Sequence, residues 1–191
     1  MADIVRMIRH AAPPPEKQGR FWGLADPGTD PAGLQAVRAA AATIEADTEY
    51  LLCSPIDRAR RTAKEITRHT GLPVVVDPAL AEMDFGKLDG MTWDEFDAAF
   101  PGEADKWTAQ GNAYTPPGGE NVDAFFGRVR DAWMRITALP DRTVCVVSHA
   151  GVLAAWNCFF AGLPLDQWTR HIPDYACPQA WIRTDNGWSR L

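Results

Sequence analysis

The chain has 191 residues, of which 46% are hydrophobic, and its formal net charge is −6. This length and composition predict one compact domain over residues 1–191 with a sizeable core. Surfaces that bind nucleic acid or anionic membranes need clustered lysine and arginine, so the acidic balance argues against both kinds of partner. It still allows a small anionic ligand that is held by a few local arginines.

The sequence shows neither a targeting signal nor a cysteine motif. The sequence has no run of about 18 apolar residues, and its first residues do not resemble a signal peptide. The cysteines, Cys53, Cys145, Cys158 and Cys177, form no Cys-x-x-Cys pair that would indicate zinc or redox chemistry. Cys53 and Cys145 lie in apolar runs and are expected to be buried and inert. We therefore expect a cytoplasmic protein in a reducing compartment.

The first predicted element is a central strand within residues 1–10. Its apolar run from Ile4 to Ile8 is almost uninterrupted, as is typical of a parallel strand that is covered on both faces. The run ends at Arg9 and His10. Open parallel sheets bind ligands outside the carboxyl ends of their strands, so these two residues are candidates for a site.

A long loop rich in proline and glycine follows His10 and carries Phe21 and Trp22. Loops of this length are usually functional. Two interpretations of the aromatic side chains stay open, because they can line the mouth of a pocket or plug the loop onto the core. Asp30 followed by Pro31 then predicts the start of a helix over residues 31–46.

The pattern of strand, polar turn and helix recurs twice further along the chain. A strand over residues 50–53 precedes a polar turn and a helix over residues 54–69, and a strand over residues 143–147 precedes a polar turn and a helix to about residue 160. Three consecutive valines predict another strand over residues 73–77. The repeated pattern favours a parallel sheet with crossover helices.

The remaining segments predict further helices and a terminal hairpin. Helices are expected over residues 92–100, 103–110 and 121–138. Thr92 and Glu95 have the spacing of a capping box, and Asn186-Gly187 between apolar runs is typical of a β-hairpin. Residues 80–86 show no clear period. The fold class is therefore α/β, a three-layer α/β/α sandwich with a mostly parallel central sheet and an antiparallel edge strand.

Polar residues follow three of the predicted strands: Arg9 and His10, Ser54 and Arg58, and Ser148 and His149. If the strands are parallel, these side chains meet at one edge of the sheet. Arginine forks bind phosphate oxygens in a bidentate way, and the start of the helix after His149 adds donors and a positive dipole end. Two arginines and two histidines in one crevice therefore predict a phosphate pocket inside an acidic protein.

Each of these residues also has a structural interpretation. A lone histidine at a strand end is more often a satisfied structural residue, and only the combination favours function. No His-x-His or His-x-x-x-His pair occurs, and nearby arginines would repel a cation, so neither a metal nor another cofactor is expected. Arg60 and Arg61 are expected on a solvated helix face.

Five blocks of the sequence resemble the histidine phosphatase superfamily, which has the phosphoglycerate-mutase-like fold. They occur in the family's order and span most of the chain: Arg9-His10, Ser54-Pro55-Ile56-Asp57-Arg58-Ala59, Leu80-Ala81-Glu82 with Phe85-Gly86, Pro117-Gly118-Gly119-Glu120, and Ser148-His149. The chain is most similar in kind to the small phosphatase branch that includes α-ribazole phosphatase.

The resemblance implies roles for the residues of the predicted pocket. His10 would be the nucleophile and become a phosphohistidine, while Arg9, Arg58 and His149 would bind the substrate by holding the phosphoryl oxygens. Covalent catalysis of this kind splits ester hydrolysis into two in-line transfers, with charge stabilisation by the arginines in place of a metal.

The resemblance also implies that Glu82 is the acid that protonates the leaving oxygen and then activates water. Asp84 and Asp89 are the alternatives among the nearby carboxylates. The chain departs from the family pattern at Ala11 and Ala150, where glycine is common, and at Asp89, where glutamate is common.

The function that follows is a metal-independent phosphomonoesterase, a hydrolase acting on a small phosphorylated substrate. Aromatic residues between the strands favour a flat leaving group, as in α-ribazole 5'-phosphate or a related nucleoside-like phosphate, although ordinary core packing explains them equally well: Phe21, Trp22, Trp93, Trp107 and Tyr114. A phosphoglycerate mutase or sugar bisphosphatase is the alternative enzyme, and a non-catalytic phospho-ligand-binding protein is the alternative of another class. A monomer and a homodimer are equally compatible with the sequence.

Overall fold

The computed structural model describes residues 1–44, 48–140 and 143–191, and a six-stranded sheet forms its centre. The strands are β1 (Ile4–Arg9), β2 (Tyr50–Cys53), β3 (Val74–Val76), β4 (Thr143–Ser148), β5 (Pro178–Thr184) and β6 (Gly187–Arg190). They lie in the order β3-β2-β4-β1-β5-β6. The pairs among β1 to β4 are parallel, while β5 pairs antiparallel with β1 and β6. The predicted mostly parallel sheet with an antiparallel edge is confirmed.

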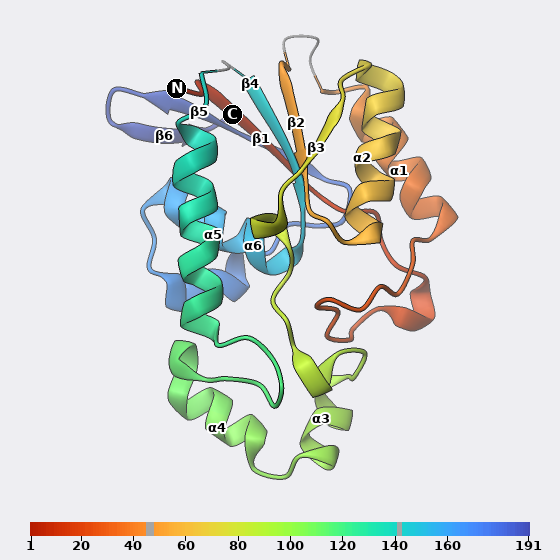
Figure 1. Cartoon of the computed structure of the whole chain (residues 1–191), viewed down its shortest axis with the longest axis vertical. Helices are drawn as coiled ribbons and strands as arrows, with labels where there is room; N and C mark the ends of the chain where they lie inside the picture. The colour runs from red at the N-terminus through yellow and green to blue at the C-terminus, as the bar shows by residue number, and fades with distance from the viewer. Residues whose placement is uncertain (45–47, 141–142) are drawn as a thin grey trace.

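Helices cover both faces of this sheet (Figure 1). They are α1 (Pro31–Ala41), α2 (Asp57–Thr70), α3 (Trp93–Ala99), α4 (Glu103–Gln110), α5 (Val122–Thr137) and α6 (Ala150–Ala161). Buried residues of α1 and α2, such as Val37 and Ile66, form one core with the sheet, and those of α5 and α6, such as Phe125 and Trp156, form the other. The predicted three-layer α/β/α arrangement is therefore confirmed.

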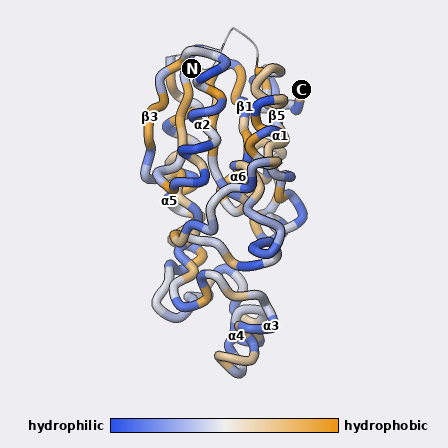
Figure 2. The backbone as a smooth tube through the Cα atoms, turned by 90° about the vertical axis from the view of Figure 1, so that its right-hand side faces the viewer, coloured by the Kyte–Doolittle hydropathy of each residue, from blue (hydrophilic) through white to orange (hydrophobic). Residues whose placement is uncertain are grey.

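Short 3₁₀ helices connect these elements: η1 (Pro15–Lys17), η2 (Pro78–Leu80), η3 (Gly86–Leu88), η4 (Gly111–Ala113) and η5 (Leu165–His171). The helices α3 and α4 lie apart from the sheet (Figures 1 and 2). They have a small core of their own around Leu88, Phe96 and Ala104. Within the described ranges, no helix is long and apolar enough to cross a membrane.

Two helix boundaries differ from the sequence prediction. Helix α1 ends at Ala41, because the backbone N–H groups of Thr43 and Ile44 donate three residues back, to Ala40 and Ala41, and tighten the chain into a turn. The predicted end at residue 46 falls outside the described residues. Helix α2 begins at Asp57 rather than at residue 54.

The later start of α2 has a local cause. The hydroxyl of Ser54 accepts a hydrogen bond from the N–H of Ile56 at 3.2 Å, which holds these residues in a turn before the helix. At its other end, Gly71 caps the helix in the left-handed conformation, as the sequence predicts. Arg60 and Arg61 are exposed on this helix, as predicted.

The predicted capping box is present at α3. Thr92 accepts a hydrogen bond from the backbone of Glu95, and the Glu95 side chain bonds the backbone of Thr92 in return. Cys53 and Cys145 are buried, as predicted, and burial raises the pKa of Cys53 to about 11 and that of Cys145 to about 12. Both thiols are therefore protonated at neutral pH.

Candidate active site

The strands β1, β2 and β4 end side by side, and the polar residues that follow them meet there. Arg9 is in register with Ser148 across β1 and β4. The backbone N–H of His10 donates to Ser148 at 3.0 Å, and that of Ser54 donates to Val147 at 3.0 Å. The three strand ends therefore form one edge of the sheet, as the sequence predicts.

His10 is buried with its ring held in one orientation. Its Nδ1 lies 2.8 Å from the carbonyl oxygen of Ala11, so Nδ1 carries a proton that it donates, and Nε2 keeps its lone pair. The Nε–H of Arg58 points at that Nε2 from 3.2 Å. Burial, together with the charges of Arg58 and Arg9, holds the pKa of His10 well below its usual range. The ring is therefore a neutral imidazole with a basic nitrogen directed into the site.

Arg58 is fully buried, and its remaining donors hold the loop that follows His10. Its NH1 donates to the carbonyl of Ala25 at 2.8 Å, and its NH2 donates to those of Trp22 at 2.9 Å and Gly23 at 2.8 Å. Asp26 lies 3.8 Å from NH1. Arg58 thus anchors the loop with both terminal nitrogens of its guanidinium, while its Nε–H bonds Nε2 of His10.

Arg9 reaches the site from the end of β1. Its guanidinium lies over the ring of Tyr175, 3.6 Å from the centroid, and its NH1 donates to the carbonyl of Pro173 at 3.0 Å. Burial lowers the pKa of Arg9, while Tyr175 and Glu82 raise it. The planar cation is therefore fixed between an aromatic face and the carboxyl edge of the parallel strands.

His149 is fully buried behind His10, with the two ring centroids 5.1 Å apart. Its Nε2 shares a hydrogen bond of 2.6 Å with the hydroxyl of Ser54. Burial and the charge of Arg58 lower the pKa of His149 well below its usual range. The residue therefore stays neutral in the folded protein at pH values where an exposed histidine would ionise.

This pKa shift predicts a pH dependence of stability. In the unfolded chain His149 takes up a proton at about pH 6.5, whereas in the folded chain it takes one up only well below that pH. The contribution of the neutral His149 to the free energy of unfolding is thus fully present above the pKa that His149 has in the unfolded chain. It is lost as the pH falls from there through the pKa that His149 has in the folded chain. We expect the stability advantage of the wild type over His149→Asn to shrink between pH 7 and pH 5, by at most about 1.4 kcal/mol per pH unit for one proton.

Urea denaturation of the two proteins at both pH values measures this difference. His69→Asn, which changes an exposed histidine on α2, is the matched control and should show a constant difference. An equally constant difference for His149→Asn would contradict the pKa shift.

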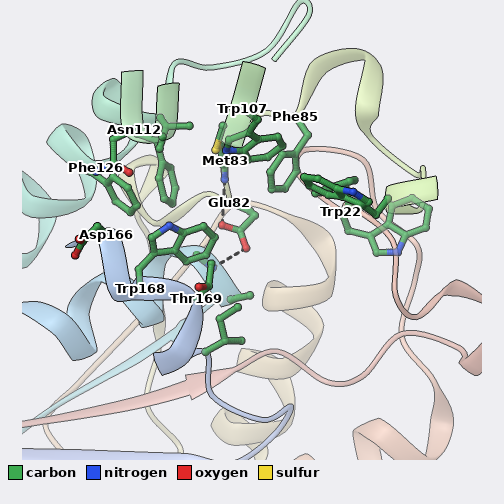
Figure 3. A pocket seen from close by; sticks show the side chains of 18 of the residues that line it. Trp22, Glu82, Met83, Phe85, Trp107, Asn112, Phe126, Asp166, Trp168 and Thr169 are labelled. Carbon is green, nitrogen blue, oxygen red and sulfur yellow. Dashed lines mark hydrogen bonds between the residues drawn. The ribbon is translucent and has the colours of Figure 1, made fainter. Parts of the chain in front are cut away.

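Glu82 is buried, and its carboxyl group lies at the amino end of α6 (Figure 3). Its Oε1 accepts from the N–H of Met83 at 3.1 Å, and its Oε2 accepts from that of Gly151 at 3.0 Å. Burial raises the pKa of Glu82 despite these bonds and the charges of Arg58 and Arg9. The group is therefore suited to holding a proton at higher pH than an exposed glutamate.

The contact with α6 changes one expectation from the sequence. The helix start was expected to offer free donors to an anion, but the N–H of Gly151 is occupied by Glu82. A Cβ at position 151 would lie 2.6 Å from Oε1 of Glu82, so this close approach requires glycine. Gly151 lies two residues after His149. This glycine is the feature of the sequence that could have indicated the close approach of Glu82.

The alternatives to Glu82 have other partners. Asp84 accepts from the N–H of Gly86 at 2.8 Å, and Asp89 accepts from those of Gly23 and Ala25 at 2.8 and 2.9 Å. Both carboxylates therefore hold loop backbone, and neither is among the described residues that line the cavity.

A cavity of about 860 Å³ opens at the carboxyl edge of the parallel strands. Arg9, His10 and Glu82 line it, whereas Arg58 and His149 lie behind His10. Much of its wall is aromatic, with rings from Trp22, Trp107, Phe126 and Trp168 (Figure 3) and from Phe21 and Trp93. The structure thus brings all five predicted site residues together, and three of them face the cavity directly.

The aromatic residues singled out in the sequence do not all have the same place. Phe21 both lines the cavity and packs on Trp107, with ring centroids 5.8 Å apart, so both interpretations of it hold. Tyr114 is buried and stacks on Trp107 with ring centroids 5.0 Å apart, and it does not line the cavity. Of the two interpretations that the sequence left open, core packing is the one that applies to Tyr114.

The two alanines that depart from the family pattern occupy different surroundings. Ala11 is fully buried, and its N–H donates to the hydroxyl of Thr62 at 2.8 Å. Ala150 lines the cavity. Over the described part of the chain, no group of three or more histidine, cysteine, aspartate or glutamate side chains is arranged to hold a metal ion.

Comparison with known proteins agrees with this geometry. The family model of the histidine phosphatase superfamily, branch 1, matches residues 5–190. A bifunctional protein of Mycobacterium tuberculosis is 36% identical over 146 residues, which make up 75% of this chain and 40% of that protein. The chain therefore spans less than half the length of the first curated relatives that it matches.

In two further comparisons the match covers most of the other protein as well as most of this chain. A glucosyl-3-phosphoglycerate phosphatase of Mycolicibacterium vanbaalenii is 32% identical over 171 residues, 85% of this chain and 76% of that protein. The crystal structure of the α-ribazole phosphatase of Shigella flexneri superposes with a TM-score of 0.88 over 98% of this chain and 94% of that chain, at 22% identity. This last likeness is one of fold.

Proposed function

The chain belongs to the histidine phosphatase superfamily, and from that premise we propose that it is a metal-independent phosphomonoesterase that works through a phosphohistidine at His10. One observation carries the proposal. Nε2 of His10 keeps its lone pair, faces the Nε–H of Arg58 at 3.2 Å, and shares a cavity with the buried acid Glu82.

In the first half of the reaction, Nε2 of His10 attacks the phosphorus atom in line with the ester bond. A bond from phosphorus to nitrogen forms as the bond to the ester oxygen breaks, and protonated Glu82 gives its proton to that oxygen. Arg9, Arg58 and His149 hold the remaining phosphoryl oxygens. Charge that spreads over these oxygens is thereby stabilised without a metal ion.

In the second half, the carboxylate of Glu82 takes a proton from a water molecule, whose oxygen attacks the phosphohistidine. The bond from phosphorus to nitrogen breaks, and inorganic phosphate leaves with His10 restored. The burial that raises the pKa of Glu82 suits a group that must first be an acid and then a base.

The wall of the cavity favours an aromatic leaving group. Arg9 is the one arginine or lysine among the described residues that line it, and the proposed chemistry assigns Arg9 to the transferred phosphoryl group. A second phosphate or a carboxylate, as in sugar bisphosphates and phosphoglycerates, would need a further cation. The lining therefore supports α-ribazole 5'-phosphate or a related nucleoside-like phosphate over the substrates of a mutase or a sugar bisphosphatase.

A substrate panel tests this preference. Trp22→Ala and Trp107→Ala are expected to lower kcat/KM for nucleoside-like and aryl phosphates about three- to tenfold relative to glycerol phosphate, since one aromatic stacking contact contributes about 0.5–1.5 kcal/mol. Trp188→Ala, in β6 and outside the cavity lining, is the matched control. If the tryptophan changes lower stability but leave the relative kcat/KM unchanged, these residues serve packing and the aromatic preference is wrong.

A further inference from the structure

Glu82 lies in a segment between η2 and η3 that has no regular secondary structure. The backbone carbonyls of such a segment need partners from elsewhere in the chain. The hydroxyl of Ser148 donates to the carbonyl of Leu80 at 2.8 Å, and the N–H of Glu120 donates to that of Asp84 at 2.8 Å. The positions on either side of Glu82 are thus fixed from two distant parts of the sequence.

One guanidinium, that of Arg128 on α5, binds three more of these carbonyls. Its NH1 donates to Ala79 at 3.1 Å and to Ala81 at 2.8 Å, and its NH2 donates to Glu82 itself at 3.0 Å. Three charge-assisted hydrogen bonds to neighbouring carbonyls fix both the position and the orientation of the backbone that carries the acid.

Glu120 orients Arg128 in turn. Its Oε1 accepts from Nε at 2.7 Å and its Oε2 from NH2 at 2.8 Å, which is the bidentate geometry of an arginine–carboxylate pair. The two side chains are 27% and 21% exposed, so solvent screens the pair less than it screens a surface ion pair. Neither residue is among those that line the cavity.

The glycines before Glu120 allow this arrangement. A Cβ on Gly119 would lie 2.4 Å from the carbonyl oxygen of Asp84, and a Cβ on Gly86 would lie 2.4 Å from the N of Gly119. The two backbones are therefore in direct contact. The Pro117-Gly118-Gly119-Glu120 block, which has no place in the reaction described above, packs against the acid-bearing segment.

We propose that Arg128 and Glu120 form a positioning pair for Glu82. The inference rests on the proposed function, because it takes Glu82 as the acid. His10, Arg9 and Arg58 are held by other partners, so loss of the pair should disturb proton transfer and leave nucleophilic attack in place. The pair should therefore reveal itself through the leaving group.

The test compares kcat/KM for glycerol phosphate, whose leaving alkoxide needs a proton, with that for p-nitrophenyl phosphate, whose leaving phenolate does not. Arg128→Ala and Glu120→Gln should lower the first value at least about tenfold and the second less than about threefold, because a misplaced acid loses proton transfer. Arg130→Ala removes an exposed arginine two residues along α5 and should change neither value.

A double variant makes the test specific to Glu82. Arg128→Ala combined with Glu82→Gln should be no slower on glycerol phosphate than Glu82→Gln alone, within about twofold, since a pair that acts only through Glu82 has nothing left to position. Equal losses on both substrates, additive losses in the double variant, or no loss at all would overturn the inference.

Folding must be measured in parallel. If Arg128→Ala is unfolded by circular dichroism, Arg128→Lys and Glu120→Gln carry the same comparison, and the same outcomes decide it. The Glu82→Gln protein distinguishes a failure of the proposed acid from a failure of the positioning pair. If it shows no leaving-group dependence, the proposed role of Glu82 fails and the pair fails with it, whereas a failure confined to Arg128 and Glu120 overturns only the pair.

Discussion

Glu82→Gln is expected to slow the hydrolysis of alkyl phosphates by about 10²- to 10⁴-fold in kcat/KM, the range that general acid catalysis contributes. Glutamine has nearly the same shape, and its single amide oxygen can still accept from the N–H of Met83 or that of Gly151, but it has no acidic proton to give. An ester whose leaving group departs as a stable anion does not need that proton. The loss on p-nitrophenyl phosphate should therefore be much smaller.

Steady-state kinetics on a series of esters with increasing leaving-group pKa measures this effect, and Asp84→Asn is its control. Asp84 lies two residues away, and its carboxylate bonds backbone at Gly86. If Asp84→Asn shows the steep dependence on the leaving group and Glu82→Gln does not, the acid has been assigned to the wrong carboxylate.

His10→Asn is expected to lower kcat at least about 10³-fold on every phosphate ester, whatever its leaving group, because the group that attacks phosphorus and carries the phosphoryl group into the second half-reaction is lost. Asparagine keeps a polar side chain of similar reach, so the buried edge of the sheet should stay folded. The loss should be uniform across the substrate series, unlike that of Glu82→Gln. Turnover numbers on alkyl and aryl phosphates measure it.

The control for this change is His69→Asn, an exposed histidine on α2 that should leave turnover unaffected. Near-wild-type turnover in His10→Asn would mean that another group attacks phosphorus. The proposal of a phosphohistidine would then be wrong, although the fold and the family would stand.

Much of the fold follows from local patterns in the sequence. The apolar runs at β1 and β4 are nearly continuous because both faces of these strands are covered. Asn186-Gly187 predicts a hairpin here, and the hairpin is present, but its turn is formed by Asp185 and Asn186, while Gly187 pairs with Thr184 as the first residue of β6. Parallel strands bring their carboxyl ends together, so the meeting of Arg9 and His10 with Ser148 and His149 follows from topology alone.

The position of Glu82, the proposed acid, and of the residues that hold it cannot be inferred in the same way. Glu82 lies in a segment with no period, which is held by hydrogen bonds from Arg128, 46 residues along the chain, and from Ser148. Such contacts depend on tertiary packing, and no local pattern reports them. Only the resemblance to the family points to Glu82, and no pattern in the sequence points to Arg128.

The helix boundaries show the same limit on a smaller scale. The apolar spacing of α1 continues to Ile44, which is buried, yet the helix ends at Ala41. A turn can keep a side chain in the core as well as a helix can. Periodicity therefore predicts which residues are buried more surely than where the helix ends.

Trapping the phosphoenzyme tests whether a phosphohistidine forms at His10. Wild type and His10→Asn are mixed with an excess of a ³²P-labelled phosphate ester in EDTA, and the reaction is quenched with acid or with alkali after one turnover. We expect label on the wild type alone, stable in alkali and lost in acid, as a phosphoramidate should be. Turnover without any such label, or equal label on His10→Asn, would contradict a phosphohistidine at His10.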